Sequence, residues 1–157
     1  MILSDIASRL ANGRLSARDH VETCLAAIDS EDGARAFITV NADTARKQAN
    51  RIDKLRAAGA ALPPFAGVTL SVKDLFDIAG EVTTAGSTVL ADAEPAERDA
   101  TVLAHLRNAG FIIVGRTNMT EFAYSGLGMN PHYGNPRSPF GRDQGGGRVA
   151  GGSSSGS

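Results

Sequence analysis

A lysine and a cluster of serines, far apart in this sequence, are the side chains best suited to catalysis. Lys73 ends the run Val-Thr-Leu-Ser-Val-Lys, in which apolar and polar residues alternate as in a strand with one packed face. It is one of only three lysines, against thirteen arginines, and it lies between Val72 and the apolar pair Leu75-Phe76. Apolar surroundings strip water from a charged amine and favour its neutral form. A neutral lysine could then act as a base that activates a serine.

Both features also have purely structural interpretations. Lys73 could end an ordinary strand and pair in solvent with Asp74 or Asp77. The serines from Ser153 onward follow a glycine-rich stretch that could be a flexible linker. This tail fits a phosphate-binding loop poorly, because it lacks the Gly-Lys-Ser/Thr ending and does not directly follow a strand.

The residues before position 63 are predicted to form a helical layer with one short strand. Helices over residues 4–13, 16–29 and 41–59 are each expected to begin at a Ser or Asn cap, with apolar residues recurring at helical spacing. Residues 37–40 are predicted to form a brief strand. The proline pair at 63–64 then marks the passage into the strand that carries the lysine.

The chain after the proline pair alternates strands and helices. The strand ending at Lys73 is followed by a helix that Asp99 could cap and Gly110 ends. The continuously apolar run at 111–114 is typical of a strand buried on both faces. Strand, helix and strand together predict an α/β sheet.

The last part of the chain is expected to be mostly irregular. Residues 117–122 are predicted to form a short helix with Glu121 completing a capping box. Residues 125–152 are rich in glycine and proline, which suits a long loop whose backbone comes near a ligand, or a disordered linker. His132 and Tyr133 are expected to pin this loop.

Composition sets limits on the function. With 157 residues, 42% of them hydrophobic, the chain can bury one core of moderate size. A formal net charge of −1 with scattered basic residues leaves no basic face for nucleic acid or anionic lipid. No apolar run is long enough for a membrane span and no signal pattern is present, so a cytoplasmic location is expected by default. The lone Cys24 shares a helical spacing with Val21 and Leu25, which predicts a buried structural thiol.

Four blocks of residues, taken in order, carry a resemblance to a known family. They are Ala-Gly-Val-Thr-Leu-Ser-Val-Lys-Asp at 66–74, Thr-Ala-Gly-Ser at 84–87, Val-Gly-Arg-Thr-Asn-Met-Thr-Glu-Phe at 114–122 leading into Asn-Pro-His-Tyr-Gly-Asn-Pro at 130–136, and Gly-Gly-Ser-Ser at 151–154. From about position 36 to the end, this ordered set resembles the N-terminal half of amidase signature enzymes. The resemblance implies the N-terminal part of their α/β fold, a mixed β-sheet covered by helices. Residues 1–62 would be a helical lead-in, and residues 63–157 the truncated start of the catalytic core of the same domain.

The resemblance also implies roles for individual residues. Members of this family hydrolyse amides through an acyl-enzyme with a Ser-cisSer-Lys triad, so Lys73 would be the base, Ser153 the bridging serine and Ser154 its supporting neighbour. In the complete enzyme we expect a cis Gly152–Ser153 peptide, with the Ser153 hydroxyl within about 2.6–3.2 Å of the Lys73 amine. In the isolated stretch the tail could instead be extended. The loop expected to flank the scissile amide is formed by Tyr124, Ser125, Gly126, Leu127 and Gly128.

Two departures from the family pattern lie near the bridging serine. Ala150 stands where the family usually has proline, and Ser155 where it usually has glycine. The family's nucleophile lies in a Gly-Gly-Ser context further on, so we expect it beyond Ser157 and expect this stretch to be inactive alone. Ser155 and Ser157 lie too near Ser153 to take that role.

The function implied by the resemblance is hydrolysis of a small carboxamide, with water as the acyl acceptor. No metal, cofactor, nucleic acid or membrane partner is expected, and a homodimer of the full-length protein is left open. One alternative is the glutaminase subunit of a tRNA-dependent amidotransferase, although residues 124–133 are more similar to stand-alone amidases. The other is a non-catalytic remnant or binding module, because the nucleophile is missing from the chain.

Overall fold

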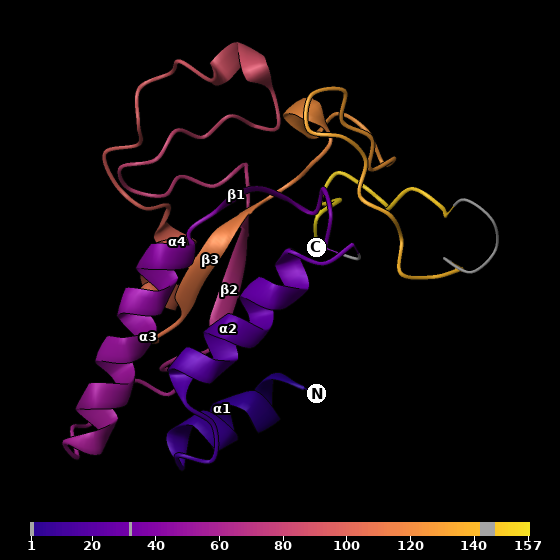
Figure 1. The fold of residues 1–157 in the computed structure, drawn as a ribbon. Helices are drawn as coiled ribbons and strands as arrows, with labels where there is room; N and C mark the ends of the chain where they lie inside the picture. The colour runs from indigo at the N-terminus through magenta and orange to yellow at the C-terminus, as the bar shows by residue number, and fades with distance from the viewer. Residues whose placement is uncertain (1, 32, 142–146) are drawn as a thin grey trace. The chain divides into compact units, whose positions relative to one another are not determined.

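The computed structural model describes residues 2–31, 33–141 and 147–157, which form two compact units (Figure 1). Unit 1 comprises Met1–Ala26, Asn41–Leu70 and Thr101–Val114. Unit 2 comprises Ala27–Val40, Ser71–Ala100 and Gly115–Ser157. The boundary at residue 62, expected from the sequence, stays a prediction.

Helices and strands alternate along the chain, and the predicted α/β fold class is confirmed. In chain order the elements are α1 (Leu3–Ala11), α2 (Ala17–Ile28), β1 (Phe37–Val40), α3 (Ala42–Ala57), β2 (Thr69–Lys73), the 3₁₀ turn η1 (Thr88–Leu90), α4 (Thr101–Asn108), β3 (Ile112–Thr117) and the 3₁₀ turn η2 (Glu121–Ala123). The strands form one sheet in the order β1-β3-β2. Each strand and helix of the predicted series is therefore present up to the end of β3.

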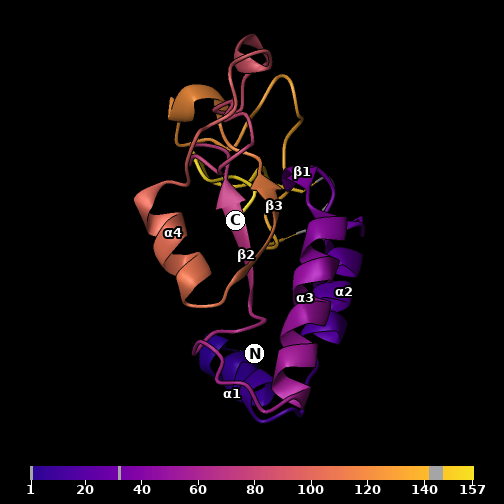
Figure 2. The same cartoon turned by 90° about the vertical axis from the view of Figure 1, so that its left-hand side faces the viewer.

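Helices α2 and α3 of unit 1 contact each other through charged side chains (Figure 2). The carboxylate of Asp53 on α3 accepts hydrogen bonds from the N–H groups of Ala17 (2.8 Å) and Arg18 (3.0 Å) at the start of α2. A negative charge is favourable there because the first N–H groups of a helix lack partners within the helix. Glu22 of α2 accepts a bidentate pair from Arg46 of α3, at 2.9 and 3.0 Å. The hydrogen bonds from Arg46 and then Arg18 lower the pKa of Glu22 to about 2.

The predicted caps are right for α2 and wrong for α1. The Ser16 hydroxyl accepts a hydrogen bond from the Asp19 N–H at 2.9 Å, as expected of an N-cap. Ser4 lies inside α1, and the N-cap is Ile2, which makes no side-chain cap hydrogen bond. The Ile2 carbonyl accepts from the next turn of α1, so the helix begins earlier than the serine pattern predicted.

The core of unit 1 lies where the helices meet the first residues of β2 and β3. In Figure 2, α4 lies on the opposite side of these strands from α2 and α3. The Ile112 N–H donates to the Val68 carbonyl at 2.8 Å, where β3 begins. Cys24 is half-buried rather than fully buried, and its Sγ lies 3.3 Å from Thr69 Oγ1. The fully buried apolar residues of this unit are Leu10, Ala17, Val21, Leu25, Ala45, Ala49, Ala66, Val68, Leu103, Ile112, Ile113 and Val114.

Unit 2 is built around the second half of β3. All six residues of β3 are buried, as predicted for the apolar run at its start. β1 pairs with β3 in antiparallel register, with Phe37 opposite Thr117. On the other side, the Asp74 N–H donates to the Thr117 carbonyl at 3.2 Å, just after β2 ends. The end of β3 therefore lies next to the residue that follows Lys73.

The capping-box helix predicted at 117–122 is wrong. β3 continues through Thr117, and only the 3₁₀ turn η2 follows, with positive φ at Phe122 (51°) and Ala123 (57°). The side chains that would form the box are engaged elsewhere, since the Asn118 amide donates to the Arg35 and Gly134 carbonyls at 2.9 Å each. Long-range hydrogen bonds therefore outweigh the local helix signal.

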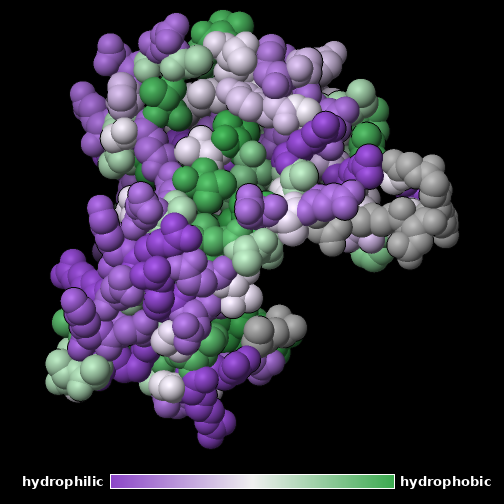
Figure 3. Space-filling model, in the orientation of Figure 1, coloured by the Kyte–Doolittle hydropathy of each residue, from purple (hydrophilic) through white to green (hydrophobic). Residues whose placement is uncertain are grey.

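The described residues contain no helix long and apolar enough to cross a membrane. Within the same residues, no group of three or more His, Cys, Asp or Glu side chains is placed to hold a metal ion. Figure 3 shows that the exposed surface over α3 is mostly hydrophilic, in agreement with its many charged residues.

Candidate active site

Lys73 and Ser153 meet although they are far apart in the sequence. The Lys73 amine, at the end of β2, donates a hydrogen bond of 2.7 Å to the Ser153 hydroxyl, and both residues are half-buried. The Gly152–Ser153 peptide is cis. The distance lies inside the range expected of the complete enzyme, and the tail is not extended as allowed for the isolated stretch. A base and a hydroxyl are thus in position for proton transfer.

The segment after β2 turns sharply and fixes the backbone of Lys73. The Lys73 carbonyl accepts hydrogen bonds from the N–H groups of Leu75 (2.7 Å) and Phe76 (3.1 Å). The turn directs the Asp74 side chain into the interior, where the residue is only 1% exposed. Pairing of Lys73 with Asp74 in solvent, the structural alternative for this lysine, therefore does not occur.

The Asp74 carboxylate is held by three donors. One oxygen accepts from the Thr84 hydroxyl and from the Gly86 N–H at 2.9 Å. The other accepts from Arg116 Nη1 at 2.9 Å, with both side chains almost fully buried. The other candidate partner of Lys73, Asp77, accepts from the Thr83 hydroxyl at 2.8 Å.

Arg116 is the centre of this polar network, and the sequence patterns did not single it out. Besides Asp74, it donates to Glu81 Oε2 (2.9 Å), to the Phe76 carbonyl (3.1 Å) and to the Thr83 hydroxyl (3.1 Å). One signal could have found it, namely an arginine at the end of a strand predicted to be buried on both faces. A buried charge requires a partner, so such an arginine predicts a carboxylate nearby.

The other side of the pair, Ser153, is held by the segments around η2. The Thr120 N–H donates to the Ser153 carbonyl at 3.0 Å. The Gly152 N–H donates to the Gly126 carbonyl at 2.7 Å, and Leu127 forms an isolated antiparallel bridge with Gly151. These bonds place the backbone that precedes the serine hydroxyl.

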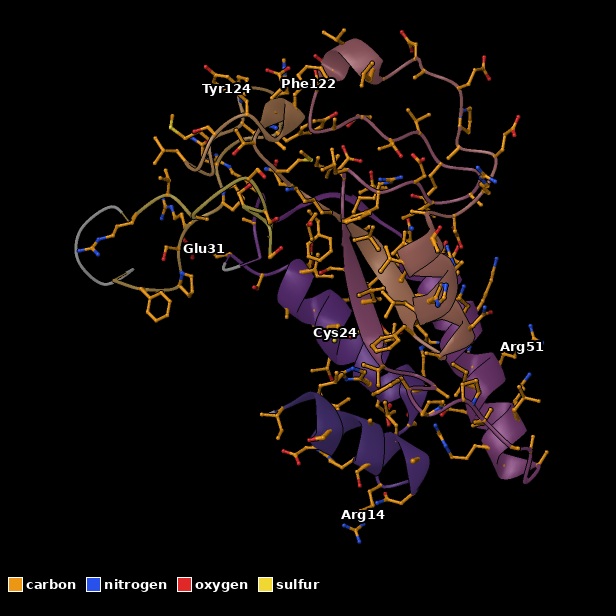
Figure 4. All side chains as sticks on the ribbon, turned by 180° about the vertical axis from the view of Figure 1, so that it is seen from behind. Arg14, Cys24, Glu31, Arg51, Phe122 and Tyr124 are labelled. Carbon is orange, nitrogen blue, oxygen red and sulfur yellow. The ribbon has the colours of Figure 1, made fainter. Side chains whose placement is uncertain are left out.

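The five residues expected to flank the substrate lie along this tail. The Gly128 N–H donates to the Ala150 carbonyl at 2.9 Å, and the Leu127 carbonyl accepts from the Thr120 hydroxyl at 2.6 Å. The Ser125 hydroxyl accepts from the Leu127 N–H at 3.1 Å and so closes the turn. The Tyr124 side chain is 92% exposed beside η2 (Figure 4). The backbone of the segment thus adjoins the tail that carries Ser153, while its aromatic ring faces solvent.

The two serines after Ser153 differ in their surroundings. Ser154 is exposed, and its carbonyl accepts from the Ser157 N–H at 3.3 Å. Ser155 is 4% exposed and packs against Gly128, where an added Cβ would lie 2.7 Å from the Ser155 Cβ. A buried Ser155 fits the expectation that it is not the nucleophile.

A second polar cluster, the Glu121 cluster, ties η1 and η2 to the loop at 130–134. Glu121 Oε1 accepts from the Ser87 hydroxyl at 2.6 Å and lies 2.8 Å from His132 Nε2. The hydrogen bond from Ser87, followed by that from His132, lowers the pKa of Glu121. The other ring nitrogen of His132 lies 3.2 Å from the Thr88 hydroxyl. His132 therefore holds the loop in place, as expected.

A mixed α/β fold that brings a strand-end lysine to a serine in a glycine-rich tail is the arrangement of an amide-hydrolysing enzyme class. The chain belongs to the amidase family of amidase signature enzymes, whose sequence model matches residues 19–157.

Relatives of this family cover nearly all of the chain. It is 45% identical over 154 residues to AtzE, the 1-carboxybiuret hydrolase subunit of Pseudomonas sp. strain ADP, covering 98% of this chain and 33% of that protein. It is 41% identical over 155 residues to a glutamyl-tRNA(Gln) amidotransferase subunit of Thermobifida fusca, covering 98% and 30%. A solved structure described as a vestigial complex that reveals the origins of an s-triazine catabolic enzyme superimposes with a TM-score of 0.90 at 44% identity, covering 100% and 34%. The chain therefore spans about a third of the length of these relatives.

Proposed function

We propose that this chain supplies the base and the bridging serine of an amide-hydrolysing enzyme, with Lys73 and Ser153 in these roles. The observation that carries the proposal is the 2.7 Å contact between the Lys73 amine and the Ser153 hydroxyl. Membership of the amidase family supports it. Since the relatives are about three times as long, the activity is proposed for the complete polypeptide, with its nucleophilic serine beyond residue 157.

The proposed reaction moves one proton along two groups of this chain. The nucleophilic serine attacks the amide carbonyl carbon while its proton passes to the Ser153 oxygen, and Ser153 gives its own proton to the Lys73 amine. A hydroxyl suits the middle position because it can accept and donate at once. When the C–N bond breaks, the leaving amine takes a proton back along the same path, and an acyl-enzyme remains. Water then repeats the sequence and releases the acid and the free serine.

The proposed substrate is a small carboxamide that lies along residues 124–128. Support comes from the hydrogen bonds that hold Gly126 and Gly128 against the backbone just before Ser153. Ser154 is proposed to support Ser153 through the backbone of the tail. A cytoplasmic location and a homodimer of the complete protein remain predictions.

A second candidate function is the glutaminase subunit of an amidotransferase that works with partner subunits. It is favoured by the 41% identity to the amidotransferase subunit of Thermobifida fusca. The same relay would then release ammonia from glutamine, so the two candidates differ in substrate and assembly. A non-catalytic remnant is the third candidate, and it predicts no turnover of any amide.

The test is ammonia release by the complete polypeptide from acetamide, propionamide, benzamide, 1-carboxybiuret and L-glutamine, with Ser153→Ala measured in parallel. We expect turnover of at least one small carboxamide and a loss of at least about 100-fold in Ser153→Ala, the usual worth of positioned proton transfer. Turnover of L-glutamine alone would favour the glutaminase candidate. Undiminished activity in Ser153→Ala would overturn the proton relay.

A further inference from the structure

A buried carboxylate next to the proposed base is a hazard for catalysis. Asp74 follows Lys73 directly in the chain and is 1% exposed. A negative charge this close, with little water to screen it, stabilises the protonated form of an amine even without contact. A protonated lysine cannot accept the proton that the proposed relay must deliver to it. The relay therefore requires the charge of Asp74 to be compensated.

Arg116 provides that compensation from β3. Its Nη1 lies 2.9 Å from Asp74 Oδ1, with side-chain exposures of 3% and 1%. The second carboxylate oxygen is turned toward the Thr84 hydroxyl and the Gly86 N–H, so hydrogen bonds fix the orientation of the group as well as its charge. A planar guanidinium that cannot lose its proton is well suited to such a site.

The remaining titratable groups of the surrounding segments are engaged separately. Glu81 pairs with Arg116 Nε at 2.9 Å and is 30% exposed, so solvent screens much of its charge. Asp77, on the turn after β2, accepts from a threonine hydroxyl. Glu121 on η2 pairs with His132. Asp74 is the most buried of the carboxylates that adjoin the base.

We propose that Arg116 is a positioning residue for the reaction, because it holds the Asp74 carboxylate and cancels its charge, leaving Lys73 free to accept a proton from Ser153. The inference rests on the proposed function. A purely structural ion pair would have the same contacts, so the two interpretations differ only in what happens to proton transfer when one partner is removed.

The test is the pH dependence of kcat/KM for benzamide hydrolysis by the complete polypeptide, measured by ammonia release. In Arg116→Met the uncompensated carboxylate should move the acidic limb of the profile to higher pH by about one unit. In Asp74→Asn the uncompensated guanidinium should move it in the opposite direction. The double variant Asp74→Asn/Arg116→Met carries neither charge, and its limb should return close to that of the wild type.

Stability effects are separated from this readout. Loss of one partner of a buried pair is strongly destabilising, so Arg116→Gln, which can still donate a hydrogen bond to Asp74, replaces Arg116→Met if the latter does not fold. A structural role predicts lower activity with unmoved limbs in every folded variant, and this result would overturn the proposal. Shifts of the same sign in Asp74→Asn and the Arg116 variants would also overturn it.

The proposed function can fail independently of this inference. If the wild type does not hydrolyse benzamide or the other amides, the proposed function itself fails. If the wild type is active and Lys73→Ala is not, but the limbs stay in place, only the role of Arg116 is refuted.

Discussion

Gly152, which precedes the bridging serine of the proposed relay, has no room for a side chain. A Cβ built there would lie 2.7 Å from Thr120 Oγ1 and 2.8 Å from the carbonyl oxygens of Ser125 and Leu127. Real Cβ atoms essentially never make contacts this short. Because two of the three atoms belong to the backbone, alanine at this position must displace the chain rather than a flexible side chain.

The cost of Gly152→Ala can be worked out from these contacts. Overpacking a filled site typically lowers the free energy of unfolding by about 1–3 kcal/mol. The displacement also strains the hydrogen bonds from Gly152 to Gly126 (2.7 Å) and from Thr120 to Ser153 (3.0 Å). A movement of about 1 Å would take the 2.7 Å contact between Lys73 and Ser153 beyond hydrogen-bond reach. We therefore expect kcat/KM of the complete polypeptide to fall at least about 100-fold.

The matched control is Gly151→Ala, one residue earlier, where an added Cβ meets nothing within 4 Å. Urea unfolding followed by circular dichroism gives the stability, and ammonia release from benzamide gives kcat/KM. Gly152→Ala should be less stable and far less active than Gly151→Ala. If the two variants are equally active while Gly152→Ala is less stable, the overpacking is real but the link between this backbone and the relay is refuted.

Three further predictions concern the same chain. Lys73→Ala and Lys73→Arg should both remove nearly all amidase activity of the complete polypeptide, because arginine keeps its proton at any working pH, and near-normal turnover in Lys73→Arg would exclude Lys73 as the base. The isolated residues 1–157 should not react with a serine-directed fluorophosphonate, and mass-spectrometric detection of the label on Ser153 or Ser155 would contradict this. Burial, with a smaller effect of Arg9, lowers the pKa of His20 from its ordinary value of 6.5, so its contribution to stability is present above pH 6.5 and is lost as the pH falls through the lowered pKa. Urea midpoints between pH 7.5 and 5 should therefore fall more steeply in the wild type than in His20→Gln.

The parts of the structure that the sequence predicts well are those set by local patterns. The alternation before Lys73 and the apolar run at 111–114 correspond to β2 and β3. The contact between Lys73 and Ser153 was expected only from the ordered motif blocks, because no periodicity relates residues so far apart. The helix at 117–122 failed because Asn118 and Glu121 satisfy partners on other loops instead of the local backbone.

The buried pair of Asp74 and Arg116 was out of reach of the sequence for a different reason. Asp74 follows a strand and looked like one of two solvent partners for Lys73, and Arg116 looked like an ordinary residue of a family motif. Their pairing depends on the turn after β2 and on the neighbouring position of β3, which only the folded chain provides. A charged residue inside a run predicted to be buried on both faces is the one local sign of such a pair.

The end of β3 holds both partners of the proposed relay. The Thr117 carbonyl accepts from Asp74, the residue next to the base, and the Thr120 N–H donates to the carbonyl of Ser153. One short, fully buried segment thus sets the distance between the lysine and the serine from both sides. A change that moves this segment as a whole should therefore disturb the relay less than a change on one side alone. For this reason Gly152→Ala, which displaces only the side of Ser153, is expected to have a large effect on catalysis for a modest loss of stability.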